Sequence, residues 1–523
     1  MNGFPATDFL VMLPMLELTI FALGILLIDL MVPKQWKWLN ANAAFLGLVF
    51  AAVGITGTPQ IWRFQVLGIY PYLERLRAMG QGGQMALYSS VYVDAFTVYF
   101  WSLFLAGAAI AILMSVRYLD IEDEHHGEYY ALLLLSVVGM MCMAAGADIV
   151  LIFVGLELMA ISTYVLVGFL RRDRRSNEAA LKYLLLGAFS SGIFAYGLSL
   201  FYGLSNSTNL RQIQIAVAGI VRNDPHNPVV IIALLTTMVG LLFKIAAIPF
   251  HQWAPDAYEG APTCITGFMS VAVKAAAWAM LLRILLYGLF PLRFLYTPII
   301  VFVSVATMTG ANFAALTQTN TKRLLAYSSI AHVGYMLLAL VAMGSSQVGS
   351  VPFWDGFKGI LVYLLVYTFM NLGAFAVITS LRHRNVIGDE LDDMAGLYSR
   401  APVAAVLMLL FLLSLAGIPP MAGFLGKYYI FLSLIESGHY WLAALGVLYS
   451  VFGLYYYLKI ANAMFMRQAL DAGRLPISVG MRVALGLTAL ATIVIGILPE
   501  PVIQSVNWSL GLSQVTHVAG MVR

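Results

Sequence analysis

Charged residues are scarce in this 523-residue chain. Only 10% of its residues are Asp, Glu, Lys or Arg, whereas 61% are hydrophobic. Soluble globular domains carry about 25% charged residues, so this chain cannot cover its surface with groups that water solvates well. The composition excludes a water-soluble globular protein of this size and indicates an integral membrane protein.

Cysteine is nearly absent, because the chain has only Cys142 and Cys264. An iron–sulfur cluster usually takes four cysteine ligands, and two cysteines in separate apolar stretches do not suggest a disulfide framework. The sequence also lacks a GxGxxG fingerprint, and GFLGKYY has neither the spacing nor the Ser/Thr of a phosphate-binding loop, since Tyr428 stands there. We expect this chain to bind no cofactor, nucleotide or metal of its own.

Long apolar runs are what the sequence has in abundance. A helix that spans a bilayer needs about 20 mostly apolar residues, and fourteen segments meet this description. We therefore expect an all-α integral membrane protein with about 14 transmembrane helices. The predicted spans lie near residues 8–32, 38–57, 94–116, 128–146, 149–169, 178–203, 229–259, 263–288, 295–317, 323–343, 357–381, 402–436, 440–464 and 483–505.

Two of these segments contain helix breakers. The seventh reads LLFKIAAIPFHQWAPDAYEG and the twelfth reads LSLAGIPPMAGFLGKYYIF. Proline removes a helical hydrogen bond, and inside a bilayer the freed backbone groups need partners from protein or cavity water. Interrupted helices at corresponding positions of two halves are typical of a repeat built around a transport path. Spans four to eight and nine to thirteen would form two inverted five-helix units, although two independent breaks are an equal alternative.

Lysine and arginine are unevenly divided between the two sides of the predicted bundle. With an even number of spans both termini share a side, and the opposite side collects most of these residues, among them Lys34, Lys37, the run RRDRR at 171–175, Lys322 and Arg323. Cytoplasmic loops carry such an excess. We expect the basic side to face the cytoplasm, in the inner membrane of a bacterium, and both termini to lie outside.

Four ionisable residues stand deep in the apolar segments. Glu157 lies about 8 residues past the start of its span, which is roughly 12 Å at 1.5 Å per residue. Lys274 lies about 11 residues into its span, and Lys244 and Lys427 flank the two proline breaks. A charge at the centre of a bilayer costs about 2.5–3.5 kcal/mol on insertion scales. Four such residues indicate a function.

The chemistry of lysine suits proton transfer in such a place. Burial favours the neutral amine and a nearby carboxylate favours the ammonium ion, so a buried lysine can exchange a proton when its surroundings change. We expect Glu157 to be the partner of Lys244, and a row of lysines joined by water to conduct protons. The alternative is a structural ion pair between Glu157 and Lys244 that fixes helix register. Lys274 and Lys427 have no obvious acidic partner.

Two further residues are candidates. Lys182 follows the RRDRR run near the start of its span, where it either extends to the membrane surface or joins the path. His332 stands in the middle of its span with Ser328, Ser329 and Tyr335 near by. Imidazole titrates near neutrality and can relay protons, and a packing histidine is an equally good interpretation.

Four stretches together resemble a known family. LLFKIAAIPFHQWAPDAYEGAPT, SVAVKAAAWAMLLRILL, NTKRLLAYSSIAHVGYML and AGIPPMAGFLGKYYIF are similar to the antiporter-like membrane subunits of complex I, the proton-pumping NADH:quinone oxidoreductase. The forms FHQWAPDAYEGAPT and GIPPMAGFLGKYYIF resemble subunit N, whereas the L and M types and the Mrp antiporter subunits usually differ after the first break. The resemblance covers most of the chain from the third span onward and leaves the segment 58–93 unmatched.

The resemblance implies an architecture and a set of functional positions. It implies three N-terminal helices, two inverted repeats around a central polar axis, and a last helix, at residues 1–127, 128–288, 289–464 and 465–523. The matching positions are a fifth-helix glutamate that modulates the path, lysines of the sixth, seventh, eighth and twelfth helices, and a tenth-helix histidine beside the second half-channel. In chain order they are Glu157, Lys182, Lys244, Lys274, His332 and Lys427.

The resemblance also implies partner subunits, and it implies that proton translocation and redox chemistry take place in different subunits. This chain would translocate protons while other subunits use NADH or ferredoxin, FMN, iron–sulfur clusters and quinone. The implied partners are a neighbouring antiporter-like subunit and the small K-, J-, A- and H-type subunits. A subunit of an Mrp-type Na⁺/H⁺ antiporter or of an energy-converting membrane hydrogenase is the alternative. The transported ion, the electron donor, the stoichiometry and the direction of each proton step stay open.

Overall fold

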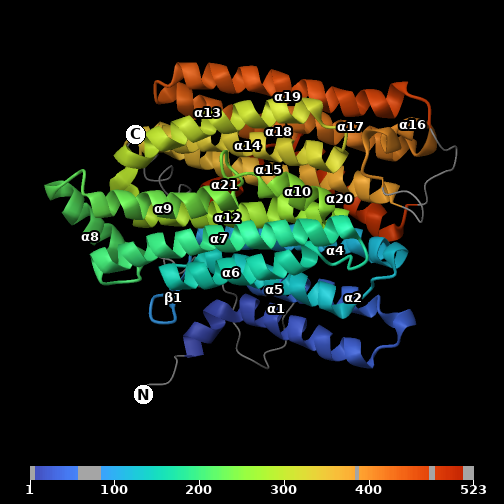
Figure 1. Cartoon of the computed structure of the whole chain (residues 1–523), viewed down its shortest axis with the longest axis horizontal. Helices are drawn as coiled ribbons and strands as arrows, with labels where there is room; N and C mark the ends of the chain where they lie inside the picture. The colour runs from blue at the N-terminus through green and yellow to red at the C-terminus, as the bar shows by residue number, and fades with distance from the viewer. Residues whose placement is uncertain (1–5, 57–83, 383–387, 470–476, 511–523) are drawn as a thin grey trace.

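A computed structural model describes residues 6–56, 84–382, 388–469 and 477–510, and these are almost entirely helical. The long helices run roughly parallel, with α1 and α2 at one face of the stack and α13 and α19 at the opposite face (Figure 1). The helices of the spans are α1 (Ala6–Met31), α2 (Leu39–Thr56), α4 (Ala95–Glu122), α5 (Gly127–Ala145), α6 (Ile149–Val167), α7 (Arg174–Ser205), α9 (Pro228–Lys244), α10 (Trp253–Gly260), α11 (Thr263–Phe268), η3 (Met269–Val273), α12 (Lys274–Leu282), η4 (Arg283–Gly288), α13 (Arg293–Thr317), α14 (Thr321–Ser345), α15 (Val351–Leu381), α17 (Pro402–Ala416), α18 (Ala422–Glu436), α19 (Tyr440–Met466) and α20 (Val479–Ile497).

The fourteen predicted spans all correspond to helices. Twelve segments of the described chain are long and apolar enough to cross a bilayer. The other two predicted spans are the interrupted ones, in which α9 is followed by α10 and α17 by α18. The predicted all-α membrane fold with two broken helices is therefore confirmed. The eighth, tenth and eleventh spans are almost fully enclosed by protein, as expected for helices that are apolar all round.

The two predicted five-helix units have the same pattern of neighbours. In the first unit α5 packs on α6, α6 on α7, and α7 on both halves of the broken helix α9–α10. In the second unit α13 packs on α14, α14 on α15, and α15 on both halves of α17–α18. The contact of α5 with α12 likewise has its counterpart in the contact of α13 with α19. This repeated adjacency places the two breaks at equivalent positions of their units.

The sequence interpretation missed or misplaced several elements. The helix α8 (Leu210–Asn223) and the hairpin of β1 (Gln84–Ala86) and β2 (Val91–Val93) were not expected. The last predicted span was too long, because α20 ends at Ile497 and a separate helix, α21 (Glu500–Ser509), follows Pro499. Of the unmatched segment 58–93, residues 58–83 lie outside the described part of the chain. The remaining short helices are η1 (Lys34–Trp36), η5 (Phe290–Leu292), η6 (Leu391–Met394) and α16 (Leu397–Arg400).

One buried ion pair ties three spans together. The Arg283 guanidinium is 2% exposed and bonds both oxygens of Asp94, Nη1 to Oδ2 at 2.9 Å and Nη2 to Oδ1 at 2.5 Å. It also donates to Ala144 O at 3.0 Å and to Thr97 Oγ1 at 2.8 Å. Asp94 caps α4 by accepting a hydrogen bond from the Thr97 backbone N–H at 2.8 Å. Both charges are therefore paired and hydrogen-bonded, the condition under which a buried ion pair is tolerated.

Removing one partner of this pair should destabilise the protein. In Arg283→Met the Asp94 carboxylate is left inside the bundle without its cation, a change that typically costs about 3–5 kcal/mol. The matched control is Arg171→Gln, because Arg171 and Glu128 form a pair whose side chains are 74% and 54% exposed, and such pairs contribute about 0–1 kcal/mol. Thermal unfolding of the purified assembly in detergent checks this. Equal melting temperatures for the two variants would contradict it.

Candidate functional site

The first break places an ammonium group at the end of a helix. α9 ends at Lys244, which is 5% exposed. The last carbonyls of a helix lack intrahelical partners, and here Phe243 O accepts a hydrogen bond from Trp253 Nε1 of α10 at 2.9 Å. A cation at this end also interacts favourably with the helix dipole. The interruption therefore creates a polar site inside the bundle at Lys244.

Glu157 acts on Lys244 without touching it. The Glu157 carboxylate is the charged group that acts on the Lys244 ammonium through space, but no ion pair within 4.0 Å joins them in the described chain. The hydrogen-bond partner of Lys244 Nζ is instead Tyr164 Oη at 3.5 Å. Glu157 Oε1 is buried and has no hydrogen-bond partner among the described residues. Glu157 and Lys244 therefore interact through space and do not form the expected direct ion pair.

Lys274 connects the two five-helix units. It begins α12 directly after the π-helical residues of η3 and is 4% exposed. Its ammonium donates to Ser329 O at 3.0 Å and to Ser329 Oγ, both on α14. Single π-helical turns inside α-helices occur frequently at functional sites. This contact links Lys274 of the first predicted unit to Ser329 of the second.

His332 lies on α14 inside a cage of hydroxyl groups and is 2% exposed. Its Nδ1 bonds Tyr363 Oη, and its Nε2 lies 2.9 Å from Tyr457 Oη. Tyr457 Oη also bonds Ser328 Oγ. In neutral imidazole one ring nitrogen donates and the other accepts, so both nitrogens are satisfied and the hydroxyls extend the network to α15 and α19.

Lys427 occupies the second break much as Lys244 occupies the first. It is 5% exposed, and Nζ donates at 2.8 Å to Ala416 O, the last residue of α17. Gly417 follows with φ +83°, and a side chain there would collide with the Lys427 methylenes. The ammonium also lies 5.0 Å from the centroid of the Tyr335 ring. Here, unlike at the first break, the broken helix itself supplies the acceptor for the buried cation.

The buried row combines positive groups with neutral partners. No ion pair of the described residues includes Lys244, Lys274 or Lys427. The ammonium groups of Lys274 and Lys427 both act through space on the His332 imidazole, which places His332 between them electrostatically. Five of the six predicted site residues place polar atoms inside the bundle and are here named the buried row: Glu157, Lys244, Lys274, His332 and Lys427.

Lys182 lies outside this row. Its side chain is 47% exposed and pairs with Glu178 at 2.8 Å and with Asp256 at 3.1 Å. Asp256 also binds Arg323 at 2.7 Å, and Arg323 binds Glu259 at 2.9 Å. Lys182 thus belongs to a surface cluster that joins α7, α10 and α14, and the structure does not bring it to the buried lysines.

Several polar residues escaped the sequence interpretation. Lys322 Nζ donates to Ala261 O at 2.7 Å and pairs with Asp389 at 3.3 Å. Burial raises the pKa of Asp389, and the neighbouring Lys322 opposes that rise. Tyr363 and Tyr457 contact His332 from helices far away in the sequence, so no local pattern identifies them. For Tyr164, the hydrogen-bond partner of Lys244, a local signal did exist. It lies seven positions after Glu157 on the same helix and therefore shares its helix face.

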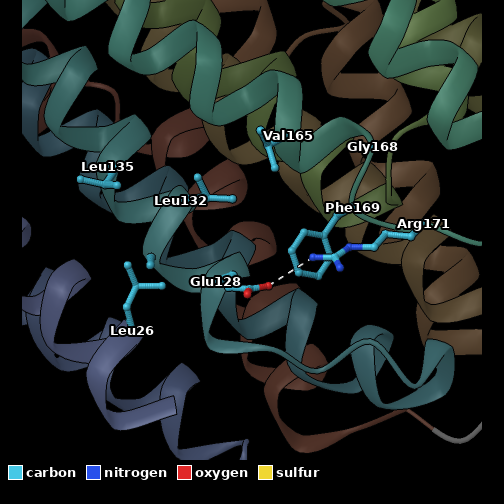
Figure 2. A pocket seen from close by; sticks show the side chains of 9 residues that line it. Leu26, Glu128, Leu132, Leu135, Val165, Gly168, Phe169 and Arg171 are labelled. Carbon is cyan, nitrogen blue, oxygen red and sulfur yellow. Dashed lines mark hydrogen bonds and ion pairs between the residues drawn. The ribbon is translucent and has the colours of Figure 1, made fainter. Parts of the chain in front are cut away.

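Two cavities open at the surface of the bundle. One, of about 280 Å³, is lined by Lys427 and by α18 and α19 side chains such as Phe424 and Val447. The other, of about 290 Å³, lies among α1, α5 and α6, and Figure 2 shows its apolar wall with the Glu128–Arg171 pair at one edge. Only the first reaches a residue of the buried row. In the described part of the chain no three His, Cys, Asp or Glu side chains are placed to hold a metal ion.

Comparison with known proteins gives consistent results. Residues 145–453 match the family described as NADH:quinone oxidoreductase/Mrp antiporter, TM. NADH-quinone oxidoreductase subunit N 1 of Koribacter versatilis (strain Ellin345) is 62% identical over 522 residues, which are 100% of this chain and 99% of that protein. A chain of respiratory complex I from Thermus thermophilus is 30% identical with a TM-score of 0.73, over 94% of this chain and 98% of its own length.

A chain of the membrane-bound sulfane sulfur reductase, an archaeal respiratory membrane complex, is 25% identical with a TM-score of 0.79, over 97% of this chain and 98% of that chain. The fold is therefore shared by more than one kind of membrane complex. The sequence identity separates them, because it is far higher to subunit N and extends over the whole chain. This chain belongs to the subunit N family of NADH-quinone oxidoreductase, the antiporter-like membrane subunits of complex I.

Proposed function

We propose that protons cross this subunit along the row of Glu157, Lys244, Lys274, His332 and Lys427 and the water between them. The observation that carries the proposal is that the three lysines and the histidine are 5% exposed or less, yet the lysines bond only neutral oxygens. A buried cation with neutral partners costs free energy, which a purely structural role leaves unexplained. Groups that bind and release protons explain it.

The two five-helix units would form the two halves of the path. The first unit, residues 128–288, contributes Glu157, Lys244 and Lys274, and the second, residues 289–464, contributes His332 and Lys427. The units are inverted relative to each other, because each has an odd number of spans. Residues 1–127 and 465–523 flank them. The repeated helix adjacency and the equivalent breaks support this division.

The path would run in the inner membrane of a bacterium with the basic side facing the cytoplasm and both termini outside. The RRDRR run at 171–175 and Lys322 support this orientation through the cytoplasmic excess of Lys and Arg. The partners would be a neighbouring antiporter-like subunit and the small K-, J-, A- and H-type subunits. Lys182 would serve at the cytoplasmic side, where its surface cluster supplies several exchangeable charges.

Redox chemistry would take place in other subunits of the complex. NADH or ferredoxin, FMN, the iron–sulfur clusters and quinone belong there, and this chain would use the energy released. An Mrp-type antiporter subunit is the second candidate, because the matching family includes both kinds of protein. Proteoliposomes distinguish them: pumping driven by quinone reduction and independent of sodium supports the first, whereas sodium-dependent proton exchange without an electron donor supports the second.

Replacing Lys244 by Met should strongly reduce pumping. Methionine is nearly as long as lysine but carries no titratable proton, so proton uptake coupled to quinone reduction in membrane vesicles should fall by at least about tenfold. The matched control is Lys459→Met, because Lys459 binds the end of α13 through Gln318 O at 2.8 Å and stands apart from the row. Unchanged pumping in Lys244→Met would overturn the assignment.

Replacing His332 by Gln should also slow pumping. Glutamine keeps one donor and one acceptor for Tyr363 and Tyr457 but takes up no proton near neutral pH. We expect at least about a tenfold lower rate with the complex still assembled. His439→Gln is the control, since His439 is partly exposed and bonds Ser345 Oγ at 2.9 Å. If both variants pump like the unmodified protein, His332 is only a packing residue.

A further inference from the structure

Tyr164 shares its helix with Glu157 and contacts Lys244. It lies on α6 seven residues after Glu157, which is about two helical turns, so both side chains share one face of the helix. The Lys244 ammonium lies 3.5 Å from Tyr164 Oη and 5.7 Å from the centroid of its ring. The Glu157 carboxylate acts through space on both Tyr164 and Lys244. Tyr164 is therefore in the field of both groups.

An aromatic stack fixes the position of this ring. Tyr164 meets Tyr183 of α7 edge-on with centroids 4.5 Å apart, and Tyr183 stacks on Trp253 of α10 at 4.5 Å with 11° between the planes. Trp253 in turn bonds the carbonyl of Phe243, the residue before Lys244. The stack connects α6, α7 and α10 to the broken end of α9, so the phenol and the ammonium are held by the same framework.

A glycine makes room for the hydroxyl group. A Cβ atom on Gly187 of α7 would lie 2.0 Å from Tyr164 Oη and 2.7 Å from its Cζ. Both distances are far below van der Waals contact, so any side chain at this position has to displace the phenol. Gly192, five residues further along the same helix, has no heavy atom within 4 Å of such a Cβ. The space at Gly187 is thus specific to Tyr164.

The chemistry of the phenol suits this place. A tyrosine hydroxyl accepts one hydrogen bond while it donates another, so Tyr164 can accept from Lys244 and keep its own proton for a second acceptor. Within the part of the chain that the structure describes, Glu157 Oε1 is buried and lacks a hydrogen-bond partner. Of the titratable groups on the neighbouring helices, Tyr183 of α7 packs against the Tyr164 ring, and Lys274 begins α12, which packs on α9. The charged group that acts on Lys244 is Glu157.

We propose that Tyr164, seated in the space left by Gly187, is the positioning residue that holds the Lys244 ammonium apart from the Glu157 carboxylate. The inference rests on the proposed function, because it matters only if Lys244 carries protons. A neutral phenol binds an ammonium ion more weakly than a carboxylate does. By giving Lys244 a neutral partner, Tyr164 lets the lysine release its proton and keeps Glu157 as a distant charge that tunes the release.

Two single substitutions test this idea from opposite sides. Tyr164→Phe removes the hydroxyl and adds no bulk, whereas Gly187→Ala keeps the hydroxyl and displaces it; Gly192→Ala is the matched control on the same helix. In each case the complete complex is assayed in membrane vesicles for protons pumped per quinone reduced, across a range of pH. Immunodetection of the subunit in the purified complex verifies assembly.

Both test variants should displace the pH profile of pumping in the same direction. Without the phenol between them Lys244 approaches Glu157 and holds its proton more tightly, so the profile should move to higher pH by about one unit. A merely structural role would lower the number of protons pumped per quinone equally at every pH. The double variant that combines Tyr164→Phe with Gly187→Ala should pump no fewer protons per quinone than Gly187→Ala alone, because both changes act on one contact. Gly192→Ala should match the unmodified complex.

The outcomes separate this inference from the proposed function. If Lys244→Met keeps full pumping, the proposed function fails. If Lys244→Met loses pumping while Tyr164→Phe retains the unmodified profile, the positioning role of Tyr164 is refuted and the path itself stands. If Gly187→Ala does not assemble, Tyr164→Phe decides alone, since it introduces no steric conflict.

Discussion

The structure depends on one constraint, namely that an ammonium group inside an apolar bundle needs hydrogen-bond acceptors. Helix ends provide them, because the last carbonyls of a helix have no partner of their own. Lys427 bonds the carbonyl of the last residue of α17, and Lys244 is itself the last residue of α9. At the second break the interrupted helix itself supplies the acceptor for Lys427, whereas at the first break the acceptor for Lys244 is the Tyr164 hydroxyl of α6.

The buried cations of this chain have one of two kinds of partner, carboxylates or neutral oxygens. The first kind suits a structural role, and the second suits proton transport. Arg283 is bonded to both oxygens of Asp94, and Lys322 is paired with Asp389, so these charges join helices permanently. Lys274 has hydroxyl and carbonyl oxygens instead. A carboxylate partner stabilises the charged form strongly, whereas neutral oxygens leave the charged and neutral forms closer in free energy. Exchange of protons is expected where the partners are neutral.

The sequence could predict those features that depend on local pattern. Apolar runs identified the spans, and prolines identified both breaks. Features that depend on distant parts of the chain were inaccessible. Lys182 is drawn into a surface cluster by Asp256, which lies 74 residues away, and Tyr457 reaches His332 across 125 residues. The amphipathic α8 was missed because its 14 residues are too few to span a bilayer and it therefore gives no hydropathy signal.

The arrangement of the row suggests how its two halves communicate. Lys274 and Lys427 both act on His332, so three positive charges in this row would repel one another strongly in a medium of low dielectric. Binding of a proton at one position therefore favours release of a proton from the neighbouring position. Lys274 of the first unit bonds Ser329 of the second, three residues before His332. In the proposed path, a change of charge at Glu157 would act on Lys244 through space and would need no large movement of the packed helices.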